Sequence, residues 1–402
     1  MVSYVNINRG TERYCYLDDS SEIIPDNCVT IAIYTYNPGK LYIVRSGQYL
    51  VKIYQECTML LESFRPKAKL VTQSTIILKP RFPVIDVHNH LGEEFGKGWI
   101  NKPINELIEM LDQSGVELYI DLDGGWGEDI LVDHIEKLKS FYPDRFQVFG
   151  GINWELWSIY GNSFPEWAAS RLHIQAEIGA QGLKIWKNLG LRVRDQHGEL
   201  VKVDDPRLEA IWQTAAELKF PVMIHVADPI AFFDPFDETN ERWEELNSNP
   251  EWRFTSPPYP SFTNIIEGLA NLVEQHPQTI FIGAHVGCYA ENLTWVANLM
   301  DRCSNFYIDI SARIGELGRQ PYTSRRFFIK YSDRVLFGSD FGPDLNAYQL
   351  AYRFLETEDE YFNYNVTEVP KQGRWNVYGL HLPDGVLRKI YRTNAQRLLL
   401  TR

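Results

Sequence analysis

The feature that most constrains the fold is a regular alternation of short apolar runs with amphipathic segments, from Val84 to the carboxyl terminus. Eight runs read as strands, at 84–90, 117–123, 146–152, 181–187, 221–226, 279–285, 305–311 and 334–340. Helical periodicity marks segments between and after them, such as 103–114, 204–219 and 384–400. Eight strand–helix units predict an α/β fold, a (β/α)8 TIM barrel, with a doubly wound open sheet as the rival.

The first 80 residues follow a different pattern. Runs with strand character occur at 29–36, 40–44, 48–54 and 71–79, and Asn37-Pro38-Gly39 reads as a turn between the first two. We therefore expect two domains, a small β-rich amino-terminal unit at 1–80 and the barrel at 81–402. Nothing in the first unit indicates chemistry.

Charge and composition narrow the class of partner. The chain has 40 Lys+Arg against 53 Asp+Glu, a net charge of −13 that argues against nucleic-acid binding. No apolar run approaches the ~18 residues that span a bilayer, and the amino terminus lacks an apolar secretory signal. The five cysteines of the chain include no CxxC pair, which fits a reducing compartment. We expect a cytoplasmic protein that acts on a small molecule.

Four histidines and one aspartate lie where predicted strands end. They are His88 and His90 on the first strand, His225 on the fifth, His285 on the sixth and Asp340 on the eighth. Residues two apart in a strand point the same way, so the first two imidazoles project together. Taken alone, each of these residues has an ordinary structural explanation, as a packing or capping residue. Gathered at one barrel mouth, three imidazoles and a carboxylate predict a divalent metal site suited to zinc, with His285 as a base or further ligand.

Two connections are longer than a barrel requires, at 228–262 and 341–382. Both leave the carboxyl ends of strands, where barrels build their active sites, and long loops are uncommon unless they are functional. The first is a candidate lid because it is rich in aromatic residues, namely Trp243, Trp252, Phe254 and Tyr259.

The strand-end motifs resemble the amidohydrolase superfamily, and closely its amidohydrolase-2 branch, which includes aminocarboxymuconate-semialdehyde decarboxylase. The motifs are I-D-V-H-N-H-L at 85–91, M-I-H-V at 223–226, G-A-H-V-G at 283–287 and F-G-S-D-F at 337–341. The N-A-Q-R-L-L ending at 394–399 resembles the terminal barrel helix of that branch. The resemblance covers Val84 to the carboxyl terminus. It is specific for the superfamily and not for the substrate.

The resemblance implies a role for each of these residues. His88, His90 and His225 would bind one divalent ion, most simply Zn²⁺, and His285 would lie beside the metal-bound water. Asp340 would ligate the metal or accept the proton of that water. A metal ion lowers the pKa of bound water from ~15.7 towards 7 and polarises a substrate carbonyl, and a neighbouring base takes the proton during attack.

Lys184 and Trp186 share a face of the fourth strand. In dinuclear members of the superfamily a lysine on this strand becomes a carbamate that bridges two metals, whereas the mononuclear branch typically has no such ligand. Lys184 therefore has three interpretations: a bridging carbamate, a cation that binds a substrate carboxylate or phosphate, or a structural ion-pair partner. We favour one metal with Lys184 in the pocket, and we expect Lys187 to face solvent.

Other pocket candidates have equally plausible structural roles. Arg313 could clamp an anionic substrate group or form a surface ion pair. Trp154 follows the third strand, and Asp121 and Asp123 end the second strand, where they could contact a ligand or cap the next helix.

Three functions from different classes remain open. The leading hypothesis is a metal-dependent hydrolase that cleaves an amide, ester or lactone bond of a small molecule. The second is a metal-dependent, non-oxidative decarboxylase, which Arg313 would favour if it reaches the metal. The third is a non-catalytic scaffold whose amino-terminal unit mediates assembly. In any of these the chain could be a homodimer.

Overall fold

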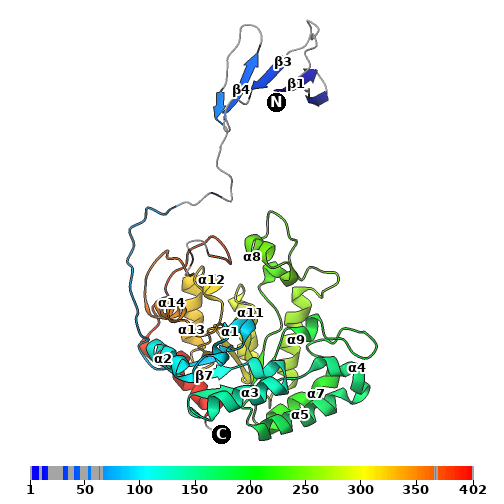
Figure 1. Cartoon of the computed structure of the whole chain (residues 1–402), viewed down its shortest axis with the longest axis vertical. Coiled ribbons are helices and arrows are strands. Elements are labelled where there is room, and N and C mark those ends of the chain that lie inside the picture. Colours follow the sequence, from blue (N-terminus) through cyan, green and yellow to red (C-terminus); the bar gives the residue numbers. More distant parts are fainter. Residues whose placement is uncertain are drawn as a thin grey trace. The chain divides into compact units, whose positions relative to one another are not determined.

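The computed structural model describes residues 67–400 except 366, 368 and 369, together with residue 63 and the backbone of five strands between residues 2 and 55. The chain divides into two compact units, Met1–Val71 and Thr72–Arg402 (Figure 1). The domain boundary at residue 80 stays a prediction.

The first unit contains one antiparallel sheet with the order β2-β1-β3-β4-β5. Its strands are β1 (Val2–Asn8), β2 (Thr11–Tyr16), β3 (Thr30–Tyr34), β4 (Lys40–Arg45) and β5 (Ile53–Gln55). β3 and β4 coincide with predicted runs, whereas most of the run at 48–54 lies outside the described residues.

The strand predicted at 71–79 is wrong. Residues 71–77 have no regular secondary structure, and the side chains of Ile76 and Leu78 are exposed. A β-branched run needs a neighbouring strand to complete its hydrogen bonds, and the described residues provide none here. Instead, the Thr75 amide and hydroxyl both donate to the carboxylate of Asp359, at 2.6 and 2.7 Å.

The second unit is built on eight short parallel strands, and each of the eight predicted runs overlaps one of them. They are β6 (Val84–Asn89), β7 (Val116–Asp121), β8 (Phe146–Val148), β9 (Leu183–Ile185), β10 (Val222–Ile224), β11 (Phe281–Gly283), β12 (Phe306–Asp309) and β13 (Val335–Leu336). They form two parallel sheets with the orders β6-β7-β8 and β13-β12-β11-β10-β9. The α/β class with parallel sheets is confirmed.

Backbone hydrogen bonds also connect the two sheets at both ends. Beyond β8, the Gly150 amide donates to the Gly182 carbonyl (3.0 Å), and the Lys184 amide of β9 donates to the Gly150 carbonyl (2.8 Å). On the other side, the Val87 amide of β6 donates to the Phe337 carbonyl, just beyond β13, at 3.0 Å. The carboxyl ends of β6 and β13 are therefore neighbours in space although they are far apart in sequence.

Helices surround these strands (Figure 1). The longer ones are α2 (Ile104–Ser114), α3 (Glu128–Lys139), α5 (Phe164–Ile178), α7 (Glu209–Glu217), α9 (Phe262–Gln275), α11 (Leu293–Arg302), α13 (Pro321–Lys330) and α14 (Leu345–Glu356). The predicted helix at 103–114 is α2. The one at 204–219 begins as a 3-10 turn before α7, and the last divides into α15 (Asp384–Arg388), a π-helical turn and α16 (Asn394–Leu399).

The strands of this unit are buried on both faces. On β10, Val222 and Ile224 join the large core between strands and helices, and Met223 joins a second cluster with Ile85 and Ile282. This explains why the runs read as almost continuously apolar. Among the described residues, no helix combines the length and apolar character needed to cross a bilayer.

Candidate active site

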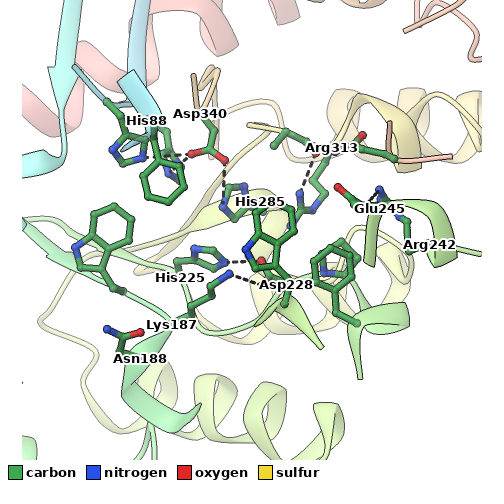
Figure 2. A pocket seen from close by; sticks show the side chains of 18 of the residues that line it. His88, Lys187, Asn188, His225, Asp228, Arg242, Glu245, His285, Arg313 and Asp340 are labelled. Atoms are coloured by element: carbon green, nitrogen blue, oxygen red, sulfur yellow. Dashed lines mark hydrogen bonds and ion pairs between the residues drawn. The ribbon is translucent and has the colours of Figure 1, made fainter. Parts of the chain in front are cut away.

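A cavity of about 290 Å³ opens where the parallel strands end (Figure 2). All five residues predicted for the metal site line it, namely His88, His90, His225, His285 and Asp340. The structure therefore brings together groups separated by up to 252 positions in the chain, from His88 to Asp340, as the strand-end pattern predicts.

His88 and His90 are each held by a buried carboxylate on a neighbouring strand end. The Nδ1–H of His88 donates to Asp309 Oδ2 at 2.9 Å, and that of His90 donates to Asp123 Oδ1 at 2.6 Å. This leaves both Nε2 atoms directed at the same oxygen, Asp340 Oδ1, which is 3.3 Å from each. Carboxylates that orient imidazoles in this way are usual around metal ligands.

Asp340 occupies a strained position between these rings. Its φ of 63° is left-handed, and its amide donates to the His88 carbonyl at 2.7 Å, which fixes the carboxylate over the strand ends. Burial alone would raise the pKa of Asp340, but its contacts with the imidazoles of His88, His285 and His90 hold that pKa well below its ordinary value. Asp340 is therefore a carboxylate at neutral pH.

His285 also has left-handed backbone, with φ of 57°, immediately after β11. Its amide donates to Asp309 Oδ1 (3.1 Å), and its Nδ1–H donates to the Ser311 carbonyl (3.0 Å). Nε2 is thus left with a free lone pair, 3.8 Å from Asp340 Oδ2. Burial, helped by the positive charge of Arg313, lowers the pKa of His285 well below its ordinary value.

His225 shares the cavity but stands apart from the tightest cluster. The potential ligand atoms of His88, His90 and Asp340 lie within 4.8 Å of one another, and in the described part of the chain His225 does not join that group. Its ring lies 4.5 Å from that of His285, and its buried Nε2 is 3.4 Å from Asp228 Oδ1 without the geometry of a hydrogen bond. Burial lowers the pKa of His225 to about 4, which leaves Nε2 free to coordinate.

Neither lysine of the fourth predicted strand lies where the sequence predicts. Lys184 is buried beneath the cavity and does not line it; its Nζ lies 3.3 Å from His88 Nε2, and burial lowers its pKa to about 8. Lys187 lines the cavity and pairs with Asp228. The prediction for Lys187 is wrong because the strand has ended: its φ and ψ of −58° and −6° are helical, so strand alternation no longer applies.

The remaining predicted contacts divide between the cavity and the core. Trp186 lines the cavity and stacks on Trp126 at 3.9 Å. Trp154 does not line it, and its predicted substrate contact is not supported. After β8 the chain turns outward through a short helical segment, so Trp154 packs against Trp157 and Phe164, with ring centroids 6.4 and 5.8 Å away.

Arg313 lines the cavity and is only 5% exposed. Its guanidinium donates to the carbonyl of Ala312 at 2.9 Å, and no carboxylate among the described residues lies within ion-pair distance of it. The Glu245 carboxylate interacts electrostatically with Arg313 but forms its ion pair with Arg242, and a buried guanidinium with no ion pair of its own is costly unless something else supplies negative charge.

Sequence reasoning missed the residues that support the site. Asp309 orients His88, and Arg242, Glu245 and Asp228 complete the cavity wall. Asp309 could have been found as a further carboxylate at a strand end. The other three lie in the 228–262 connection, where no periodic pattern indicates which side chains face inward.

The donor set fits a divalent cation. Two imidazoles with carboxylate-bonded Nδ1 atoms present Nε2 to one carboxylate oxygen, and a third buried Nε2 lacks a hydrogen bond. These are the nitrogen and oxygen donors that zinc and similar ions prefer.

Comparison with known proteins agrees with this geometry. A family model described as amidohydrolase matches residues 162–400, which include three of the four strand-end motifs. A solved structure of 2,6-dihydroxybenzoate decarboxylase complexed with 2,6-dihydroxybenzoate aligns with a TM-score of 0.51 and 16% identity, over 79% of this chain and 99% of that one. The same enzyme from Rhizobium aligns with a TM-score of 0.50 and 15% identity, again over 79% and 99%.

At this level of sequence identity, the two solved structures are evidence of a similar fold and of nothing further. A search of curated proteins finds no match to the sequence. The family model spans more than half of the chain, and the resemblance seen in the strand-end motifs is confirmed: the chain belongs to the amidohydrolase family, in its amidohydrolase-2 branch.

Proposed function

We propose that the protein is a metal-dependent, non-oxidative decarboxylase of a small aromatic carboxylic acid. This reverses the order of the two hypotheses drawn from the sequence, in which hydrolysis came first. The observation that carries the proposal is Arg313, a buried cation that lines the cavity without a carboxylate partner among the described residues. A substrate carboxylate would supply the missing charge through a charge-assisted hydrogen bond.

The cavity wall supports an aromatic substrate. Phe95, Trp126 and Trp186 stack in series, with centroids 6.2 Å apart for the first two and 3.9 Å for the last two. Phe232 and Trp252 line the cavity as well, with ring centroids 6.1 Å apart. Stacked and edge-on ring contacts favour a planar ring between such walls.

A divalent ion would be held by His88, His90 and Asp340, with His225 as a further donor; we propose one ion per chain and zinc as its identity. When bound, such an ion supplies positive charge that attracts and polarises an anionic substrate oxygen. Asp123 and Asp309 keep the two ligand imidazoles in the required tautomer.

The chain's own residues then handle one proton. In the proposed reaction a proton joins the ring carbon that bears the carboxylate; the bond from that carbon to the carboxylate carbon breaks, its electron pair restores the aromatic ring, and CO2 leaves. His285 Nε2 accepts a hydrogen bond from a substrate hydroxyl, and Asp340 Oδ2 passes a proton taken from solvent water to the ring carbon. Arg313 holds the carboxylate until the bond breaks.

For the scaffold, we propose that the eight strands form a closed (β/α)8 barrel. The hydrogen bonds from Gly150 to Gly182 and from Val87 to Phe337 support closure, because each connects the outer strands of the two sheets.

Hydrolysis is the second candidate, and Lys184 is the observation that favours it. An amine 3.3 Å from a metal-ligand imidazole, with its pKa lowered to about 8, is deprotonated often enough to react with CO2. The resulting carbamate would offer oxygen ligands for a second ion. Two ions per chain, found by elemental analysis, would favour this arrangement.

The test compares the two reactions directly. The full chain, loaded separately with Zn²⁺ and Mn²⁺, is incubated in D2O with 2,6-dihydroxybenzoate, the ligand of the similarly folded decarboxylase, and with other hydroxybenzoates. A parallel panel contains amides, esters and lactones. We expect CO2 release and one deuterium at the ring carbon that carried the carboxylate. Turnover of the second panel without CO2 release from the first would overturn the proposal.

A further inference from the structure

A second cavity adjoins the first on the other side of Asp340. Its volume is about 390 Å³, against about 290 Å³ for the cavity that holds the histidines. The two share Asp340, Ala312, Glu245 and Gln372 in their linings, so they are continuous past the carboxylate to which we assign the proton transfer. We call this second cavity the side chamber.

The side chamber is lined mainly by apolar side chains. They are Ile310, Ile314, Phe337, Phe341, Ala347, Leu350, Ala351 and Phe354, contributed by the ends of β12 and β13, by α12 (Ile314–Leu317) and by α14. The first cavity differs in that it carries the histidines, Lys187, Arg242 and Arg313 beside its aromatic wall.

The charged groups that line only the side chamber do not form a binding site for an ion. Lys97 Nζ and Asp344 Oδ2 pair with each other at 3.2 Å, and Lys371 is exposed. The Tyr364 hydroxyl already donates to the Gly373 carbonyl at 3.1 Å. Glu245 and Asp340 belong to the edge shared with the first cavity, so beyond that edge an uncharged apolar group is the occupant that the mainly apolar walls stabilise.

The sizes of the two cavities indicate how a substrate divides between them. A benzene ring occupies an apolar cavity of about 150 Å³, so a single-ring acid is accommodated by the first cavity alone. A substrate limited to one ring would leave the side chamber without a ligand. The chamber begins at Asp340, beside the reacting carbon, and so lies within reach of a ring substituent.

We infer that the side chamber is a substrate subsite and that the natural substrate is an aromatic acid with an apolar substituent, alkyl or aryl, that extends past Asp340. The inference rests on the proposed function for the carboxylate end and deepens it for the other end. The 341–382 connection then selects the substrate, because α14 together with Tyr364, Asn365, Lys371 and Gln372 forms much of the chamber wall.

The test measures binding of two homologous series to the metal-loaded full chain by titration calorimetry. One series contains 3-alkyl- and 4-alkylbenzoates from methyl to hexyl, and the other contains the matching neutral alkylbenzenes. Each methylene that enters the chamber should lower Kd about fourfold until the chamber is full, as expected for burial of a CH2 group. If Kd does not depend on chain length in either series, the inference is wrong.

Two substitutions on α14 locate the effect. Ala347→Phe fills the chamber and should reduce the ratio of methyl to hexyl Kd to about one. Its neighbour Asn346 is exposed, so Asn346→Phe adds the same ring outside the chamber and should preserve the ratio. An unchanged ratio in Ala347→Phe places the alkyl group elsewhere and contradicts the inference. If Ala347→Phe fails to fold, Leu350→Ala enlarges the chamber and should extend the gain to longer chains.

The neutral series separates this inference from the proposed function. If the benzoates bind no better than the alkylbenzenes, and Arg313→Met changes the Kd of neither series, the proposed carboxylate site is wrong. The side chamber is still supported in that case by the dependence of Kd on chain length. If the benzoates bind through Arg313 without any gain from the alkyl chain, the chamber fails and the proposed function stands.

Discussion

The two sides of the cavity are held in place in different ways. On the strand-end side, His88, His90 and His285 are fixed by buried hydrogen bonds to Asp309, Asp123 and the Ser311 carbonyl, all at or just beyond the ends of parallel strands. On the other side, the wall that carries Arg242 and Glu245 belongs to the 228–262 connection. It is held to the rest of the unit by ion pairs across segments: Arg242 with Glu316, Glu241 with Arg319, and Glu244 with Arg374.

This difference indicates that metal binding and substrate selection depend on different parts of the site. Groups that must meet one metal ion need fixed positions, and neighbouring strand ends supply them. Groups that select the substrate sit on connections, which can change without disturbing the strands. The predictions below test whether the strand-end side and the connection side of the cavity act independently.

The largest effect is expected on the strand-end side. His88→Ala removes a ligand nitrogen, so bound metal should fall from about one ion per chain to almost none and turnover should fall about 1000-fold. His173→Ala, which removes an exposed imidazole on α5, is the matched control and should retain both. Elemental analysis and initial rates measure the result; full metal content in His88→Ala would contradict the assignment.

A large stability effect is expected on the connection side. Arg242 is fully buried and paired with Glu245 and Glu316, so Arg242→Met leaves buried carboxylates uncompensated and should lower the free energy of unfolding by about 3–5 kcal/mol. Arg319→Met breaks the exposed pair with Glu241 and should cost under about 1 kcal/mol. Urea unfolding of the metal-loaded protein measures both. Equal losses would show that burial does not distinguish these pairs.

Arg313 connects the two sides, and its effect should appear in substrate binding. Arg313→Met removes the charge that pairs with the substrate carboxylate, so KM should rise about 100-fold, whereas Arg313→Lys should recover part of that loss. Steady-state kinetics at constant metal content separate KM from kcat. A loss confined to kcat in both variants would move Arg313 from binding to chemistry.

The smallest effect concerns Asp359, which anchors the 341–382 connection. Burial would raise its pKa, but the Thr75 donors and the Arg353 guanidinium, 2.7 Å away, hold that pKa below the ordinary value. A depressed carboxyl pKa stabilises the fold above the unfolded value of ~3.9, and that contribution disappears as the pH falls through the folded value.

The corresponding variant tests this sign. Asp359→Asn should cost about 1–2 kcal/mol of unfolding free energy at neutral pH, and the difference from the original protein should shrink below about pH 4. Urea unfolding between pH 3 and pH 7 gives the two curves. A difference that stays constant across this range would exclude the ionised Asp359 as its source.

Much of the site could be predicted because it depends on local patterns. Strand runs are recognised from their composition, and parallel strands end at one edge, so His88, His225 and Asp340 could be expected in one place. Lys187 could not be placed, since its orientation depends on the residue at which β9 stops. Trp154 was misplaced for a similar reason, because the turn after β8 carries it away from the cavity.

By itself, the sequence determined the eight alternating strands and helices and the imidazoles and carboxylate at their carboxyl ends, because both follow from periodicity along the chain. Only the tertiary structure decided that Asp309 and Asp123 orient the histidines, that Arg313 has no carboxylate partner among the described residues, and that an apolar chamber continues past Asp340. These properties arise from packing between separate segments of the chain, 33 residues apart for His90 and Asp123 and 221 for His88 and Asp309. The direction of each side chain is set there by its neighbours in space and leaves no periodic trace in the sequence.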